Sequence, residues 1–130
     1  YRTYPGCAVR LHTQFASIPA WSDEAHVVEN RRLYREKFSR TTPLIAAALQ
    51  QEIAIPAGGF YLWPKVPDDA AFTRGLFEHQ HVTVLPGRYL ARETGSGNPG
   101  IGRVRISWVA SVADCDEAAR RIAEFAHSSL

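Results

Sequence analysis

Two arginines on one short segment are the residues best suited to bind a ligand. Segment 102–109 alternates apolar residues at 104, 106 and 108 with Arg103, Arg105 and Ser107. This period of two predicts a β-strand with one face on the core and the arginines on the other face. A guanidinium group binds a carboxylate through two parallel hydrogen bonds. The pattern therefore indicates either a carboxylate site or arginines that face water on a half-exposed strand.

Other residues that look like catalytic motifs lack the context that such motifs need. Gly95–Gly100 matches the dinucleotide-binding fingerprint, but that motif must follow a strand and open a helix, whereas a strand follows here. His79 and His81 have no further ligand at metal-binding spacing. Cys115 lies on an apolar helical stripe, and Cys7 has no activating base nearby in the sequence. No nucleophile, general base or cofactor anchor is evident, so the two arginines describe half a site.

Length and composition indicate one ordinary domain. The chain has 130 residues, of which 45% are hydrophobic and 22% charged, which suffices for a buried core. A net charge of +2 is too weak a field to predict binding to nucleic acid or to an anionic membrane. No apolar run reaches the length of a membrane span, no signal segment opens the chain, and two cysteines suit free thiols in a reducing cytosol. The chain lacks methionine and begins at Tyr1, so we expect a piece of a longer protein.

Periodicity and turn residues predict the elements that position the arginines. A partly helical stretch is expected at 11–16. A helix is expected at 22–39, capped by Ser22, and a second one at 42–50, with Pro43 at its first position. A third is expected at 68–79, capped by Asp68 or Asp69, and a fourth at 111–126, capped by Ser111 or Asp114. The expected strands cover 51–55, 60–66, 82–85 and 102–109. The strand at 60–66 is apolar on both faces up to Trp63, so we expect it to be buried.

The last helix has the clearest amphipathic pattern. Its apolar stripe comprises Cys115, Ala118, Ala119, Ile122, Phe125 and Ala126, which must pack on a sheet. The order α-α-β-β-α-β-β-α predicts an α/β fold of the two-layer α+β kind, with a small mixed β-sheet and helices mainly on one face.

Three motifs, in this order, resemble a known family. They are Pro56–Trp63 (PAGGFYLW), Val82–Gly87 (VTVLPG) and Gly102–Ser107 (GRVRIS). The chain resembles the C-terminal, small domain of class I/II, fold-type I aminotransferases, which depend on pyridoxal 5'-phosphate. The stretches Asn30–Phe38 and Leu85–Arg92 are most similar to bacterial succinyldiaminopimelate aminotransferases of lysine biosynthesis.

The resemblance implies specific roles. Arg105 falls on the family's arginine that binds the substrate α-carboxylate, with Arg88 and Gly59 as weaker contacts. The cofactor lysine and phosphate-binding residues are expected upstream, so neither Lys37 nor Lys65 is assigned that role.

The resemblance also implies how the intact enzyme is organised. Residues 1–21 would be the remnant of a large-domain or interdomain segment, and 22–130 the small substrate-binding domain. The intact enzyme would be a cytoplasmic homodimer that acts on amino acids and 2-oxo acids, and the isolated piece would be inactive. The alternative is a free-standing regulatory module that binds amino acids without catalysis.

Overall fold

The computed structural model describes residues 9–129, and the chain divides into two compact units, residues 1–32 and 33–130. The first unit holds helix α1 (Leu11–Ser22) and the start of α2 (Ala25–Ala48). The first helix is therefore longer than predicted. Ser22 ends it instead of capping the next helix, and its hydroxyl donates to Ile18 O. Asp23 accepts from Ala25 N at 3.0 Å and so caps α2 in its place.

Helix α1 buries none of its residues. Its large apolar side chains at 11, 15, 18 and 21 are between 61% and 83% exposed. Among the described helices, none is both long and apolar enough to cross a membrane. Cys7 lies outside the described residues, so its predicted state is not addressed by the structure.

The expected break between two helices at Pro43 does not occur. Helix α2 continues through this proline to Ala48, although a proline inside a helix removes one backbone hydrogen bond. Phe38, Thr42 and Ile45 are all buried around it. Burial of Phe38 and Ile45 on either side of the proline offsets the lost hydrogen bond, which the local pattern alone does not reveal.

The second unit contains a three-stranded sheet with the order β1-β3-β2. Strand β3 (Val104–Ser107) pairs antiparallel with β1 (Tyr61–Leu62) on one side and with β2 (Leu85–Pro86) on the other. Both pairings are antiparallel, so the sheet is antiparallel and not mixed as predicted. The predicted strand at 51–55 is not formed, because this extended segment makes no ladder.

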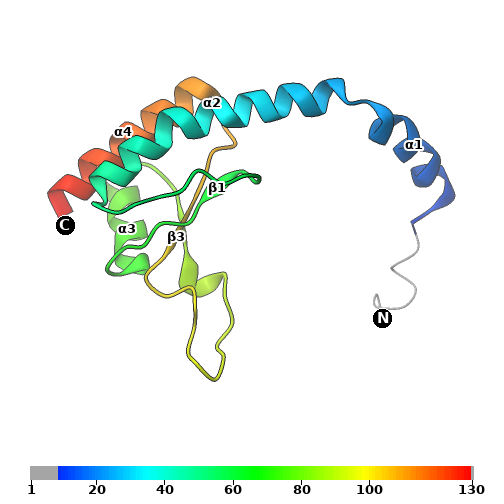
Figure 1. Ribbon diagram of the computed structural model, residues 1–130. Helices are drawn as coiled ribbons and strands as arrows, with labels where there is room; N and C mark the ends of the chain where they lie inside the picture. The colour runs from blue at the N-terminus through cyan, green and yellow to red at the C-terminus, as the bar shows by residue number, and fades with distance from the viewer. Residues whose placement is uncertain (1–8, 130) are drawn as a thin grey trace. The chain divides into compact units, whose positions relative to one another are not determined.

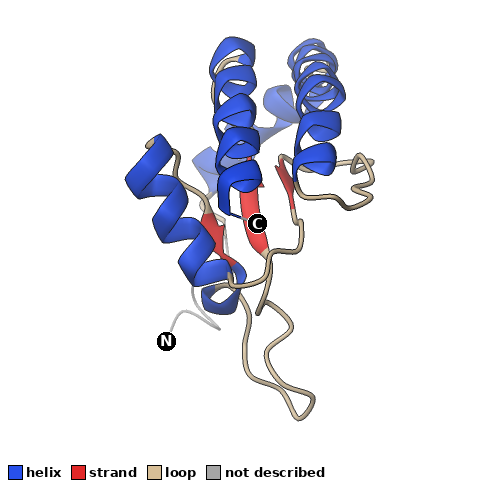
Figure 2. Cartoon of the chain, turned by 90° about the vertical axis from the view of Figure 1, so that its left-hand side faces the viewer, coloured by secondary structure: helices blue, strands red, loops and turns tan. Residues whose placement is uncertain are grey.

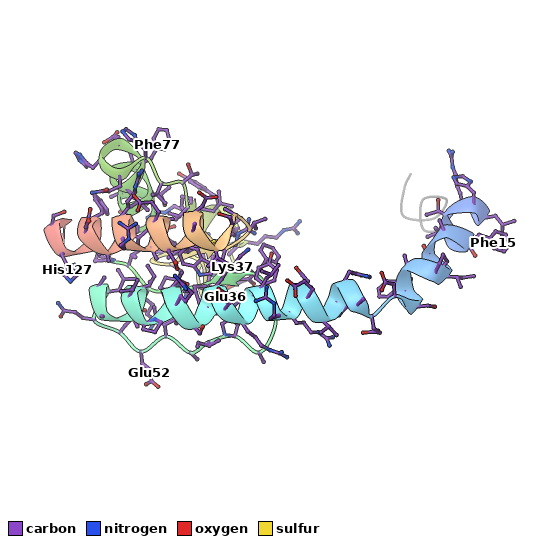
Figure 3. The ribbon with its side chains drawn as sticks, turned by 90° about the horizontal axis from the view of Figure 1, so that it is seen from above. Phe15, Glu36, Lys37, Glu52, Phe77 and His127 are labelled. Atoms are coloured by element: carbon purple, nitrogen blue, oxygen red, sulfur yellow. The ribbon has the colours of Figure 1, made fainter. Side chains whose placement is uncertain are left out.

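Helices cover the inner face of the sheet, as predicted. Helix α4 (Val112–Ser129) lies between α2 and α3 (Asp69–Gln80), and the strands run beside these helices (Figures 1 and 2). The view from above shows α4 between the other two helices (Figure 3). The core comprises Phe38, Ile45, Leu62, Phe72, Leu76, Val104, Ile106, Trp108, Cys115, Ala119, Ile122 and Phe125, among others. The two-layer fold is therefore confirmed.

The segment around β1 is buried on one face only, contrary to the prediction. Leu62, Pro64 and Val66 are buried, whereas Tyr61 is 41% exposed, Trp63 is half-buried and Lys65 is exposed. The β1 segment alternates because helices cover only one side of this sheet. Its apolar outer face therefore stays open.

Side chains at two helix starts behave largely as predicted. Asp68 caps α3 and accepts from Ala70 N and Ala71 N. At α4 it is Ser111 that caps, since its hydroxyl accepts from Asp114 N and donates to the Asp114 carboxylate at 2.6 Å. This reciprocal contact fixes where the chain leaves β3 for α4.

Candidate substrate-binding site

Arg105 lies in the middle of β3, on the face that the helices leave open. It is paired with Leu85 of β2, and its guanidinium carbon lies 5.8 Å from the centre of the Tyr61 ring. Its Nε is buried and has no hydrogen-bond partner among the described residues. An unpaired buried guanidinium N–H is costly. The strand thus presents a donor group that an anionic ligand can satisfy.

Several other arginines bond to acceptors within the protein. Arg40 bonds to Asp116, and Arg121 bonds to Glu117. Arg103 donates from Nη1 to Trp63 O at 3.0 Å. Compared with these arginines, Arg105 is the better candidate to bind an anion, because its buried Nε has no acceptor among the described residues.

Arg88 is held by two carboxylates at the start of α3. Its Nε donates to Asp69 Oδ1 at 2.8 Å, its backbone N donates to Oδ2 at 2.9 Å, and its Nη2 reaches Asp68 at 3.0 Å. Asp69 is fully buried and also accepts from Gly102 N. The predicted weak contact of Arg88 with substrate stays a prediction, since the structure commits this guanidinium to Asp69.

The pKa of Asp69 reflects this arrangement. Burial opposes ionisation of the carboxyl group. Hydrogen bonds from the Arg88 side chain, the Arg88 backbone and the Gly102 backbone outweigh this effect and hold the pKa of Asp69 at about 2. The ionised carboxylate joins α3 to both ends of the 87–102 loop. This loop leads directly into β3, so the hydrogen bonds to Asp69 help to position the strand that carries Arg105.

Gly59 lines a cleft of about 610 Å³ beside β1. Its φ of +99° suits glycine, and the space where a side chain would begin is open. Tyr61 and Arg103 line the same cleft. Tyr61 therefore borders both this cleft and Arg105, and Gly59 lies two positions before it in the chain. The weak contact of Gly59 with substrate stays a prediction.

The sequence pattern does not identify Tyr61 as a site residue, because the apolar run at 60–66 predicts a strand buried on both faces. The alternation of Tyr61, Trp63 and Lys65 with buried residues contained the signal. The pairing of Tyr61 with Ser107, which brings its ring close to Arg105, depends on a register that the pattern did not supply.

The structure shows where the other candidate motifs lie. Gly95–Gly100 forms turns that lead into β3, with no helix after them. Within the described residues, no group of three or more histidine, cysteine or acidic side chains could hold a metal. Cys115 is buried, and burial raises the pKa of its thiol, as expected of a core residue.

Comparison with known proteins places these features in a family. The sequence model for aminotransferase class I and II matches residues 4–122. Transaminase BacF of Bacillus subtilis is 33% identical over 113 residues, which cover 84% of this chain and 27% of that protein. LL-diaminopimelate aminotransferase of Nitratidesulfovibrio vulgaris Miyazaki F is 35% identical over 117 residues, with 85% and 28% covered.

A solved structure agrees with the sequence relatives. The aminotransferase from Neisseria meningitidis is 51% identical, with a TM-score of 0.83 over 95% of this chain and 32% of that one. The chain spans only about a quarter to a third of the length of these relatives. None of these three names is succinyldiaminopimelate aminotransferase, and they agree only at the level of the family. The chain belongs to the aminotransferases of class I and II.

Proposed function

We propose that this chain forms the substrate-binding part of an aminotransferase, in which Arg105 binds the α-carboxylate of the amino acid. The observation that carries this proposal is the buried, unpaired Nε of Arg105 on the open sheet face. A carboxylate there would accept two parallel hydrogen bonds and satisfy that donor. Holding the substrate by its carboxylate fixes the orientation of the bond that must react.

Neither lysine of this chain is assigned to hold pyridoxal phosphate, the cofactor of this family. The sequence contains two lysines, Lys37 and Lys65. Lys37 is buried, and its Nζ donates to the carbonyl oxygens of Trp108 and Val109 at 3.1 and 3.4 Å. Lys65 is exposed at the edge of the sheet. In this proposal the cofactor is held by another part of the enzyme, and this chain supplies substrate contacts.

The more specific proposal is that the enzyme is a succinyldiaminopimelate aminotransferase of lysine biosynthesis. The relative named LL-diaminopimelate aminotransferase and the resemblance of residues 30–38 and 85–92 support a substrate of the diaminopimelate type. We further propose that residues 22–130 are the small domain, that residues 1–21 come from a large-domain or interdomain segment, and that the intact enzyme is a cytoplasmic homodimer. The 130-residue chain alone would then have no transaminase activity.

A second candidate is an amino-acid-binding module without catalysis. Residues 33–130 form a compact unit with a core of their own, which favours this alternative. The two proposals differ in a simple measurement. A module would bind glutamate as the 130-residue chain alone, without cofactor, whereas the aminotransferase proposal expects productive binding only in the longer enzyme.

The test of Arg105 is Arg105→Lys in the full-length enzyme that carries this sequence. Lysine keeps the charge but cannot form the two parallel hydrogen bonds, so we expect kcat/KM to fall by about 10- to 100-fold for every amino donor. Cofactor absorbance should be unchanged. The matched control is Arg74→Lys on the exposed side of α3, which should retain full activity. Unchanged kcat/KM in Arg105→Lys would refute the assignment.

A further inference from the structure

The cleft beside β1 carries two positive charges that face each other. Lys65 and Arg103 are directly opposed in an isolated antiparallel bridge, and both line the cleft. The flanking bonds, Val104 N to Pro64 O and Val66 N to Gly102 O, make this a non-hydrogen-bonded pair. In such pairs the side chains are closest together. Like charges directly opposite each other destabilise a sheet, so an anion between them would relieve the repulsion.

Both cations retain free donors. The only hydrogen bond found for the Arg103 side chain within the described residues is the one from Nη1 to Trp63 O. The Lys65 ammonium makes no hydrogen bond or ion pair to the described residues, and the Lys65 backbone is fixed separately by the Gln51 amide at 2.8 and 3.0 Å. The strand is thus anchored while both cationic heads remain available.

One acidic residue borders this cleft. Glu52 contributes to its wall, but its side chain points away from the body of the molecule (Figure 3). Tyr61 and Trp63 also line the cleft, and their aromatic rings suit the methylene groups of an extended ligand. The cleft therefore combines an aromatic wall with a cationic end.

The cleft and the Arg105 site belong to one surface. Arg103 and Arg105 share the outer face of β3, two residues or roughly 7 Å apart along the strand. Tyr61 borders both, since it lines the cleft and lies 5.8 Å from Arg105. A ligand with two carboxylates at that separation can reach both arginines.

We propose that Lys65 and Arg103 form a second anion site, which binds the distal carboxylate of an amino acid whose α-carboxylate lies on Arg105. The preferred substrates are amino dicarboxylic acids longer than aspartate. The role of the second carboxylate rests on the function proposed above for Arg105, whereas the anion site itself follows from the opposed cations.

The test is Arg103→Gln in the full-length holoenzyme, with 2-aminoadipate and norleucine as paired amino donors. These donors differ mainly in the distal carboxylate. We expect kcat/KM for 2-aminoadipate to fall by about 10- to 100-fold, with norleucine little changed. An equal loss for both donors would show that Arg103 only supports β1, and no loss for either would also overturn the proposal.

Lys65→Gln provides a second variant that leaves the fold intact, because the Lys65 side chain is exposed. It should lower the preference for 2-aminoadipate by about two- to fivefold, and an unchanged preference would contradict the site. Calorimetric titration with adipate and hexanoate gives a reading independent of turnover. Adipate should bind more tightly to the unmodified enzyme, and Arg103→Gln should remove that difference. Persistence of the difference in the variant would place the anion elsewhere.

These experiments separate the two proposals. Arg105→Lys should weaken both donors alike, whereas Arg103→Gln should weaken only the dicarboxylic one. If Arg105→Lys leaves both donors unchanged while Arg103→Gln removes the preference, the α-carboxylate assignment fails and the second anion site stands.

Discussion

The buried carboxylate of Asp69 should be the main support of the loop that leads into β3. It accepts hydrogen bonds from the Arg88 side chain, the Arg88 backbone and Gly102 N. Asp69→Asn removes the charge and places an NH2 group where the carboxylate accepts. Breaking a buried ion pair costs about 3–5 kcal/mol. Because Arg88 is 31% exposed and keeps its contact with Asp68, we expect about 2–3 kcal/mol here.

The effect should depend on pH in a defined direction. The pKa of Asp69 is about 2 in the folded protein and about 3.9 in an unfolded chain. A lowered pKa stabilises the fold at pH values above the unfolded pKa. This contribution of roughly 2–3 kcal/mol is lost as the pH falls from about 4 to about 2. Asp69→Asn has no such titration. The difference between the two proteins should therefore shrink over that pH range.

Amide hydrogen exchange at Arg88 and Gly102 measures the effect locally, since both N–H groups donate to Asp69. At pH 6, Asp69→Asn should speed their exchange by about 30- to 100-fold relative to the unmodified protein. The matched control is Asp68→Asn, which keeps an N-cap and loses only an exposed ion pair, so it should change these exchange rates far less. Equal effects of the two substitutions, or a difference that persists at pH 2, would refute the reasoning.

Two further substitutions test the surroundings of Arg105 and of the loop. Tyr61→Ala should raise KM by about two- to fivefold, because the ring beside the Arg105 guanidinium is lost, whereas Tyr61→Phe keeps a ring and should leave KM near that of the unmodified enzyme. Equal KM values of the two variants in steady-state kinetics would argue against a positioning role for the ring. Gly100→Ala should lower the melting temperature strongly, because its new methyl group would clash with Gly87 O. Gly95→Ala places its methyl group in open space and should change the melting temperature little. Similar melting temperatures of the two variants would show that the loop can shift to accommodate the methyl group.

Local patterns in the sequence were sufficient for several elements. The stripe of α4 and the alternation around Arg105 both follow from the periods of helix and strand, which depend only on neighbouring residues. The N-cap at Asp68 is likewise local. These features identified the two-layer fold and the strand that carries the candidate arginine.

Other features depended on contacts between distant residues. The continuation of α2 through Pro43 requires burial of Phe38 and Ile45 against the rest of the core. The one-sided burial around β1 requires knowledge of which face the helices cover. Neither is encoded in a window of a few residues, so both predictions were wrong.

Sequence alone was enough to identify the residues that could bind a carboxylate, because Arg103 and Arg105 share one face of any strand they occupy. Only the folded structure shows which of them has a buried donor without a partner, since the partner of Arg103 is a carbonyl group 40 positions away in the chain. It also placed Lys65 opposite Arg103 and the Tyr61 ring beside Arg105. Strand register sets these neighbours, and register is fixed only when the strands pair.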